Sequence, residues 1–159
     1  MWTWIIMVVI LIVGLNMFFK SKKLKSNLSE DVTKAYEWIS EALKSSNYDA
    51  DFSFDSLKEV ERFFEENCED GNAKSGGLLS ENLGQRLFSI GCYVGEVIRR
   101  HYDGEWITND NDPWGEINIG IKLSDWSIVW PVQKVMKRFK NGKEDSIYVY
   151  GIALKPENK

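Results

Sequence analysis

The chain has few of the side chains that most catalytic and metal sites require. Its 159 residues include one histidine, His101, and two cysteines, Cys68 and Cys92. The cysteines have no CxxC partner, and no histidine stands at a zinc-ligand spacing from them. No serine, cysteine or acidic residue stands at a spacing from His101 that defines a catalytic triad. The sequence therefore predicts two buried or half-buried thiols, no cofactor and no metal site.

Basic residues are also scarce where a nucleic-acid partner would need them. Lys20, Lys22, Lys23 and Lys25 precede residue 26, and no acidic residue accompanies them. The remainder carries 16 basic and 24 acidic groups, net −8, and residues 26–81 alone are at net −9. Because phosphates demand clustered lysine and arginine, we expect no nucleic-acid partner for this domain.

Charged residues are absent from Trp2 to Phe19. As a helix this stretch would span about 27 Å, just enough for a hydrocarbon core of about 30 Å. A cleaved signal peptide is the alternative, but there is no basic n-region and no small-x-small cleavage site. We expect residues 1–19 to form a transmembrane helix that contacts the lipid bilayer through residues 2–19. The basic linker, residues 20–28, follows the span. The positive-inside rule then predicts a single-pass protein of the inner membrane with its C-terminal domain in the cytoplasm.

Residues 29–155 have the pattern of one α+β domain, followed by a tail at 156–159. Ser29 suits the N-cap of a helix that extends to Ser45. Ser53 or Asp55 can cap a second helix, whose apolar stripe consists of Leu57, Val60, Phe63 and Phe64. Its other side is typical of a solvated face and carries Glu59, Glu61, Glu65 and Glu66. Residues 69–77 predict a flexible connection.

The longest helical pattern of the domain lies between Leu79 and Trp106. Its apolar side chains fall on one face when each residue turns the helix by about 100°: Leu87, Ile90, Val94, Val97, Ile98 and His101. A second stripe consists of Gly84, Gly91 and Gly95. Glycine inside a helix costs up to about 1 kcal/mol relative to alanine. The stripe therefore predicts another element packed very close to this backbone.

After His101 the pattern changes to short strands. Residues 105–108 and 126–130 favour strands, and residues 116–123 alternate, with Ile117, Ile119, Ile121 and Leu123 on one side. Pro131 suits the first turn of a following helix, and residues 145–154, which also fit a strand, are predicted as a last helix. The fold class is therefore α+β. It comprises an N-terminal transmembrane helix and a helical layer packed on a short three-stranded antiparallel sheet.

Charged and aromatic side chains supply candidates for an interaction surface. Arg99 and Arg100 follow Glu96 by three and four residues, which predicts exposed ion pairs, a charged recognition surface or an ion-pair network that reaches the strands. Basic residues between Lys134 and Lys143 fit a solvated helix end. They also fit a surface that docks on the anionic leaflet or on the acidic first half of the chain. The high tryptophan content is the most informative feature of this region, because tryptophans that are exposed together mark a partner surface.

Two further sites were open to a functional interpretation. The loop that begins at Asp110 partly matches an EF-hand, but Trp114 and Ile121 occupy positions where calcium ligands are required. We expect a turn with its own Asx hydrogen bonds there. His101 falls in the last turn of the central helix, where it can hydrogen-bond free carbonyls. The alternative is a small enzyme in which Glu96, His101 and Asp103 share a cleft.

Three segments carry a resemblance to a known group of domains. They are GCYVGEVIRR at residues 91–100 with Trp106 beyond it, the Trp130-Pro131 step, and VMKRFKNGKEDSI at residues 135–147. Together they resemble a family of small bacterial domains of unknown function, over residues 53–150 and outside the membrane segment. The family supplies no reaction. Similar domains are associated with bacterial competition and immunity loci, which implies an immunity-type protein.

These observations favour a non-enzymatic, membrane-tethered cytosolic domain that binds a protein partner. In the immunity-type form, that partner is a toxin that the domain neutralises. The alternatives are a small enzyme using Glu96 and His101 and an accessory subunit of a membrane protein complex. The predicted interaction surface consists of Glu96, Arg99, Arg100, Trp106, Trp114, Trp126, Trp130, Lys137 and Arg138.

Overall fold

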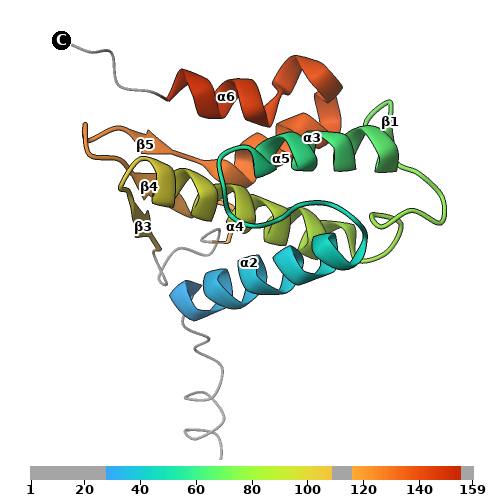
Figure 1. Ribbon diagram of the computed structural model, residues 1–159, viewed down its shortest axis with the longest axis horizontal. Coiled ribbons are helices and arrows are strands. Elements are labelled where there is room, and N and C mark those ends of the chain that lie inside the picture. Colours follow the sequence, from blue (N-terminus) through green and yellow to red (C-terminus); the bar gives the residue numbers. More distant parts are fainter. Residues whose placement is uncertain (1–27, 109–115, 155–159) are drawn as a thin grey trace, which may run out of the picture.

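The computed structural model describes residues 28–108 and 116–154, which form five α-helices, one 3-10 helix and two small antiparallel sheets (Figure 1). The fold class of this part is α+β, as predicted. None of the helices described here is both long and apolar enough to cross a membrane. The predicted transmembrane helix, most of the basic linker and the tail at 156–159 lie outside the described residues.

The central element is α4, Leu83–His101, as the apolar pattern predicted (Figure 1). α2, Leu28–Ser45, runs antiparallel to it, and α5, Pro131–Asn141, packs on another side. α3, Ser56–Asn67, packs with α6, Ile147–Ala153, and the 3-10 helix η1, Gly142–Asp145, joins α5 to α6. The last segment is therefore a helix, as predicted. Ser146 caps it by accepting a hydrogen bond from the Val149 N–H (3.2 Å).

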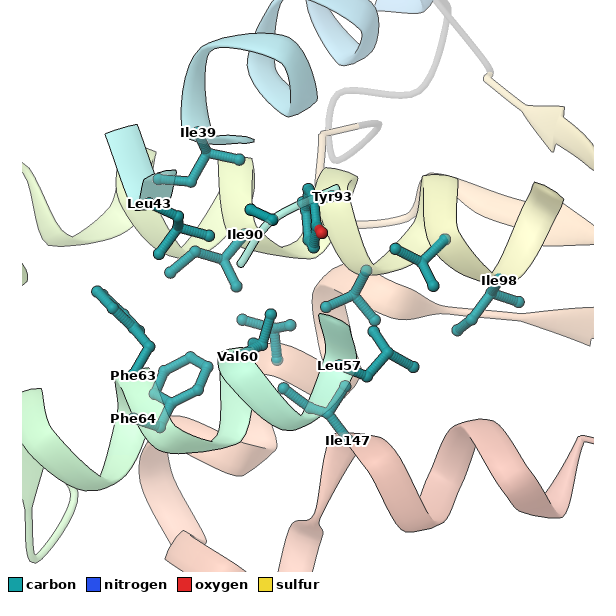
Figure 2. Packing of buried hydrophobic residues seen from close by; sticks show 14 of the residues in the cluster. Ile39, Leu43, Leu57, Val60, Phe63, Phe64, Ile90, Tyr93, Ile98 and Ile147 are labelled. Carbon is teal, nitrogen blue, oxygen red and sulfur yellow. The ribbon is translucent and has the colours of Figure 1, made fainter. Parts of the chain in front are cut away.

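The main core lies between α2, α3 and α4. Figure 2 shows Ile39 and Leu43 of α2 near Ile90 of α4, with Val60 and Phe63 on α3 at the opposite side. Each is buried, and full burial of such a side chain stabilises a fold by about 1.5–3 kcal/mol. The predicted apolar stripe of α3 is therefore confirmed.

The main sheet has the order β3-β4-β5 and is antiparallel throughout, as predicted. β3 is Glu105–Ile107, β4 is Gly120–Lys122 and β5 is Ile128–Val129. Trp106 pairs with Ile121, which pairs in turn with Val129. These three side chains share the inner face of the sheet, toward the helices, because side chains alternate along a strand.

The strands are shorter than predicted. Within residues 116–123 only Gly120–Lys122 pair, and Ile117 is exposed although it was expected on the buried side. Ile119 is buried in a second small cluster with Leu28 and Val132, so the chain before β4 packs on helices rather than on a strand. Trp126, predicted as a strand residue, has φ 71° and belongs to the turn before β5.

The predicted flexible connection at 69–77 instead begins as a hairpin. β1, Cys68–Glu69, pairs with β2, Asn72–Ala73, across Asp70 and Gly71. Both turn residues have positive φ, 49° and 72°, as a primed two-residue hairpin turn requires. A Cβ at Gly71 would lie 2.7 Å from the Lys140 carbonyl oxygen. The hairpin tip therefore rests against the end of α5.

Helix starts differ from the predictions by a few residues. Ser29 lies within α2, which already begins at Leu28, so it is not the N-cap. At α3 the cap is Ser53, whose Oγ accepts from the Ser56 N–H (3.2 Å), whereas the Asp55 side chain caps nothing. α4 begins at Leu83, and the chain from Leu79 leads into it without helical structure.

Candidate interaction surface

Two glycines of α4 set how closely its neighbours approach. A Cβ at Gly91 would lie 2.6 Å from the Cα of Val132. One at Gly95 would lie 2.9 Å from the Cγ of Pro131 and would collide with the Trp106 ring. The stripe therefore predicted close packing correctly at these two positions. It was wrong at Gly84, where a Cβ would have nothing within 4 Å.

Glu96, which directly follows Gly95 on α4, accepts hydrogen bonds from three side chains. Only 2% of the residue is exposed. Its carboxylate accepts from Arg99 Nε (2.8 Å) and Nη2 (2.9 Å), from Arg100 Nε (2.8 Å) and from Trp106 Nε1 (3.0 Å). Burial by itself raises the pKa of Glu96, but the hydrogen bonds from these three residues hold it below its ordinary value.

This network connects α4 to β3, which was one of the predicted possibilities. The prediction of exposed surface pairs is wrong for Glu96 because its carboxylate is enclosed. Trp106 is half-buried and packs against the core through the inner sheet face. The two arginines remain partly exposed, and the Arg100 guanidinium carbon lies 4.2 Å from the Phe52 ring centroid.

Arg138 is also interior, although it was predicted on the interaction surface. It is 3% exposed, and its Nε donates to the Glu61 carboxylate at 2.6 Å. Glu61 also accepts from Ser146 Oγ (2.8 Å) and from the N–H groups of Ile147 and Tyr148 at the start of α6. The prediction that Glu61 lies on a solvated face is therefore wrong. Burial raises the pKa of Glu61, but Arg138 and Ser146 bring it below its ordinary value.

Two residues of the basic run, Arg138 and Lys143, contact acidic residues of α3, in agreement with one of the predicted alternatives. Besides the Arg138–Glu61 pair, Lys143 Nζ lies 3.0 Å from Glu65. Lys137 is exposed and remains a surface residue. Part of the charge asymmetry along the chain is therefore used in ion pairs between α3 and the α5–η1 segment.

The outer face of the main sheet carries exposed apolar side chains. Ile128, which is 47% exposed, pairs with Lys122. A Cβ at Gly120 would lie 3.1 Å from Ile128 Cγ2 and 3.0 Å from Trp130 Cζ3, so both side chains meet over Gly120. The Lys122 Nζ in turn lies 3.9 Å from the centroid of the Trp126 ring. We call these residues, Gly120, Lys122, Trp126, Ile128 and Trp130, the outer sheet face.

Trp126 is the most exposed large apolar residue of this face, at 77%. Its N–H donates to the Leu123 carbonyl oxygen (3.0 Å), and its φ of 71° lies in the left-handed region. A bulky residue is rare at such an angle, which glycine adopts without strain. Neither its backbone conformation nor its exposure stabilises the fold, so folding alone does not explain a tryptophan here.

The residues of the predicted enzyme site are not arranged around one cleft. His101 is exposed at the end of α4, where its ring lies 4.4 Å from that of Phe54. It was predicted on the apolar face, but the buried part of that face ends at Ile98, three residues before His101. Glu96 is enclosed by Arg99, Arg100 and Trp106 instead of facing His101.

The thiols agree with the prediction. Cys68 is half-buried and Cys92 is buried, and neither forms a disulfide. Burial raises the pKa of the Cys68 thiol to about 11 and also raises that of Cys92. Both are therefore protonated near neutral pH and poor nucleophiles.

Sequence reasoning missed one exposed tryptophan, Trp38 on α2, at 50%. It borders a groove of about 660 Å³ between α2 and α4 that also includes Ala35, Gly84 and Phe88. The available signal was that Trp38 lies off the apolar stripe of its helix. Trp114, predicted on the interaction surface, and the rest of the predicted Asx turn at 109–115 lie outside the described residues.

Comparison of the chain with protein-family models, with curated proteins and with solved structures finds no match.

Proposed function

We propose that this chain is a membrane-tethered domain that binds a protein partner in the cytoplasm. Residues 2–19 would anchor it in the inner membrane, and the outer sheet face would bind the partner. The proposal keeps Trp126 and Trp130 from the predicted surface. It replaces the buried Glu96 and Arg138 and the half-buried Trp106 with Lys122 and Ile128.

The observation that carries the proposal is the clustering of exposed apolar side chains on the outer sheet face. Trp126, Ile128 and Trp130 are all exposed, and they lie on one side of the hairpin. Tryptophan is among the residues that dominate binding energies at interfaces, and contiguous apolar patches on a monomer mark interaction sites. A partner that covers these side chains would recover about 25 cal/mol for each Å² of apolar surface removed from water.

Binding is favoured over the enzymatic alternative by the state of Glu96. A general base needs a free lone pair and a pKa close to the working pH. The pKa of Glu96 is lowered, and both carboxylate oxygens already accept hydrogen bonds. We therefore assign Glu96 a structural role, that of tying β3 to α4.

The immunity-type form of this function follows from the sequence resemblance. In that form the protein partner is a toxin, and the domain neutralises it by occupying a surface that the toxin needs. The tether would keep the domain at the inner membrane, where a toxin that enters the cell first arrives.

The test is affinity capture from native membranes with the full chain and two matched variants. Trp126→Ala combined with Ile128→Thr should lose the captured protein while keeping the circular dichroism and unfolding midpoint of the wild type. Trp38→Ala removes an exposed tryptophan from α2 and should retain it. Equal capture by all three proteins would exclude the outer sheet face.

The tether is tested separately. The full chain should stay with membranes during alkaline carbonate extraction, and deletion of residues 2–19 should release it. Release of the full chain by carbonate would refute the membrane part of the proposal without affecting the binding part.

A further inference from the structure

A cleft beside the outer sheet face indicates which kind of side chain the partner presents. It lies between β3 and the turn that joins β4 to β5, and its volume is about 220 Å³. Its lining consists of Asp103, Glu105, Lys122, Leu123, Ser124 and Trp126. Asp103 and Trp126 are both non-glycine residues with left-handed backbone, at φ 52° and 71°. Backbone strain of this kind costs about 1–3 kcal/mol per residue and is concentrated at functional sites.

Carboxylates outnumber cations around this cleft. Asp103 and Glu105 line it, and Asp125 lies on the adjoining turn, whereas Lys122 is the one basic residue of the lining. Hydrogen bonds from the Ser127 hydroxyl and N–H (2.6 and 2.9 Å) lower the pKa of Asp125, so it is ionised near neutral pH. Arg99 interacts with Asp103 through space, but its guanidinium is hydrogen-bonded to Glu96. The cleft is therefore net negative.

The aromatic wall of the cleft already attracts a cation. The Lys122 Nζ lies 3.9 Å from the centroid of the Trp126 ring, well within the range of about 6 Å for a cation–π interaction. Most of the ring surface nevertheless remains in solvent, since the residue is so largely exposed. A tryptophan ring beside two carboxylates is a combination that recognises an ammonium or guanidinium group.

We infer that this cleft receives a basic side chain of the protein partner, an inference that rests on the proposed function. The charged head of an arginine or lysine would lie between the Asp103 and Glu105 carboxylates, with its aliphatic stem on the Trp126 ring. Apolar residues of the partner next to it would cover Ile128 and Trp130. The partner surface is therefore basic and apolar together. An anionic bilayer is a poorer occupant, because the acidic cleft repels its headgroups.

The test uses the full chain in phosphatidylcholine nanodiscs, labelled with ¹⁵N at the tryptophan indoles. The Trp126 signal is assigned by its loss in Trp126→Phe. The probe is the peptide acetyl-Gly-Leu-Arg-Leu-Gly-amide, and the control peptide carries uncharged citrulline in place of arginine. The arginine peptide should shift the Trp126 signal saturably and bind about 3–10-fold more tightly than the citrulline peptide.

Charge variants show whether the carboxylates cause this difference. Asp103→Asn combined with Glu105→Gln should bind the two peptides equally. Glu37→Gln combined with Glu41→Gln removes the same charge from the exposed side of α2 and should bind like the wild type.

Equal shifts of the Trp126 signal by both peptides, or no shift by either, would overturn the inference. Broadening of the Trp126 signal by spin-labelled lipid without peptide would assign the face to the bilayer and overturn it as well. If the Trp126→Ala, Ile128→Thr variant still loses its captured protein in those cases, the proposed function stands, and only the inference that the partner inserts a basic side chain is refuted.

Discussion

Alanine at Gly95 should destabilise the domain, whereas alanine at Gly84 should not. Both glycines lie on α4, so alanine's higher helix propensity favours each substitution by up to about 1 kcal/mol, less at Gly84 in the first turn. At Gly95 the new Cβ meets the Trp106 ring and the Cγ of Pro131, and at Gly84 it meets nothing within 4 Å. The two substitutions therefore differ mainly in their tertiary contacts, and the smaller propensity gain at Gly84 does not reverse that difference.

The magnitude follows from what the Trp106 ring must do. Overpacking of an ordered core costs about 1–3 kcal/mol. If the ring moves aside, Glu96 also loses the hydrogen bond from Trp106 Nε1, and a bond to a charged group contributes about 1.5–3 kcal/mol. After the gain in propensity, Gly95→Ala should lose about 1.5–5 kcal/mol of unfolding free energy, and Gly84→Ala should gain a few tenths.

The assay is equilibrium urea unfolding of the full chain in a mild detergent, followed by circular dichroism. Near-ultraviolet dichroism of the tryptophans should also change in Gly95→Ala and stay unchanged in Gly84→Ala. The reasoning fails if the two variants have the same unfolding free energy, or if Gly95→Ala is as stable as the wild type. Either result would mean that Trp106 and Pro131 do not press on the helix backbone.

Two further predictions concern the buried carboxylates. Arg138→Met leaves the Glu61 carboxylate without its cation and should lower the unfolding free energy by about 3–5 kcal/mol. Lys137→Met, on the exposed side of the same helix, should change it by less than about 0.5 kcal/mol in the same urea assay. Equal effects of the two substitutions would contradict a buried Arg138–Glu61 ion pair. Folding lowers the pKa of Glu96 below its ordinary value of 4.5. Its ionised form therefore stabilises the domain above pH 4.5, and this stabilisation is lost as the pH falls through the folded-state pKa. Glu96→Gln should therefore be less stable at pH 7 and lose less stability between pH 7 and pH 3 than the wild type, and parallel pH curves for the two proteins would contradict this.

Local patterns predicted the helices because their signals are short-range. The apolar positions of α3 and α4 recur at helical spacing, and each helix buries the face that the spacing defines. The same reasoning failed at the hairpin of residues 68–73. Its strands are two residues each, too short for alternation to appear, and the Asp70-Gly71 turn was the only signal.

The candidate site was only partly predictable, since exposure depends on contacts that spacing does not show. Glu96 and its arginines lie within four positions of one another, and the pairing was predicted from that spacing. The Arg138–Glu61 pair joins residues 77 positions apart, and no local pattern indicates it. Of the predicted tryptophans, Trp106 is tied to the interior by its hydrogen bond to Glu96, whereas Trp126 is outside.

The sequence by itself determined the α+β class, the central helix, the order of the three strands and the close approach at Gly91 and Gly95. Each follows from periodicity, turn residues or side-chain size within a short segment. Only the tertiary structure decided which charged and aromatic residues are buried, and it placed Trp126 in a turn next to Asp103 and Lys122. The physical reason is that burial and electrostatic environment arise from elements distant in the chain, and each residue type is compatible with either outcome until those elements meet.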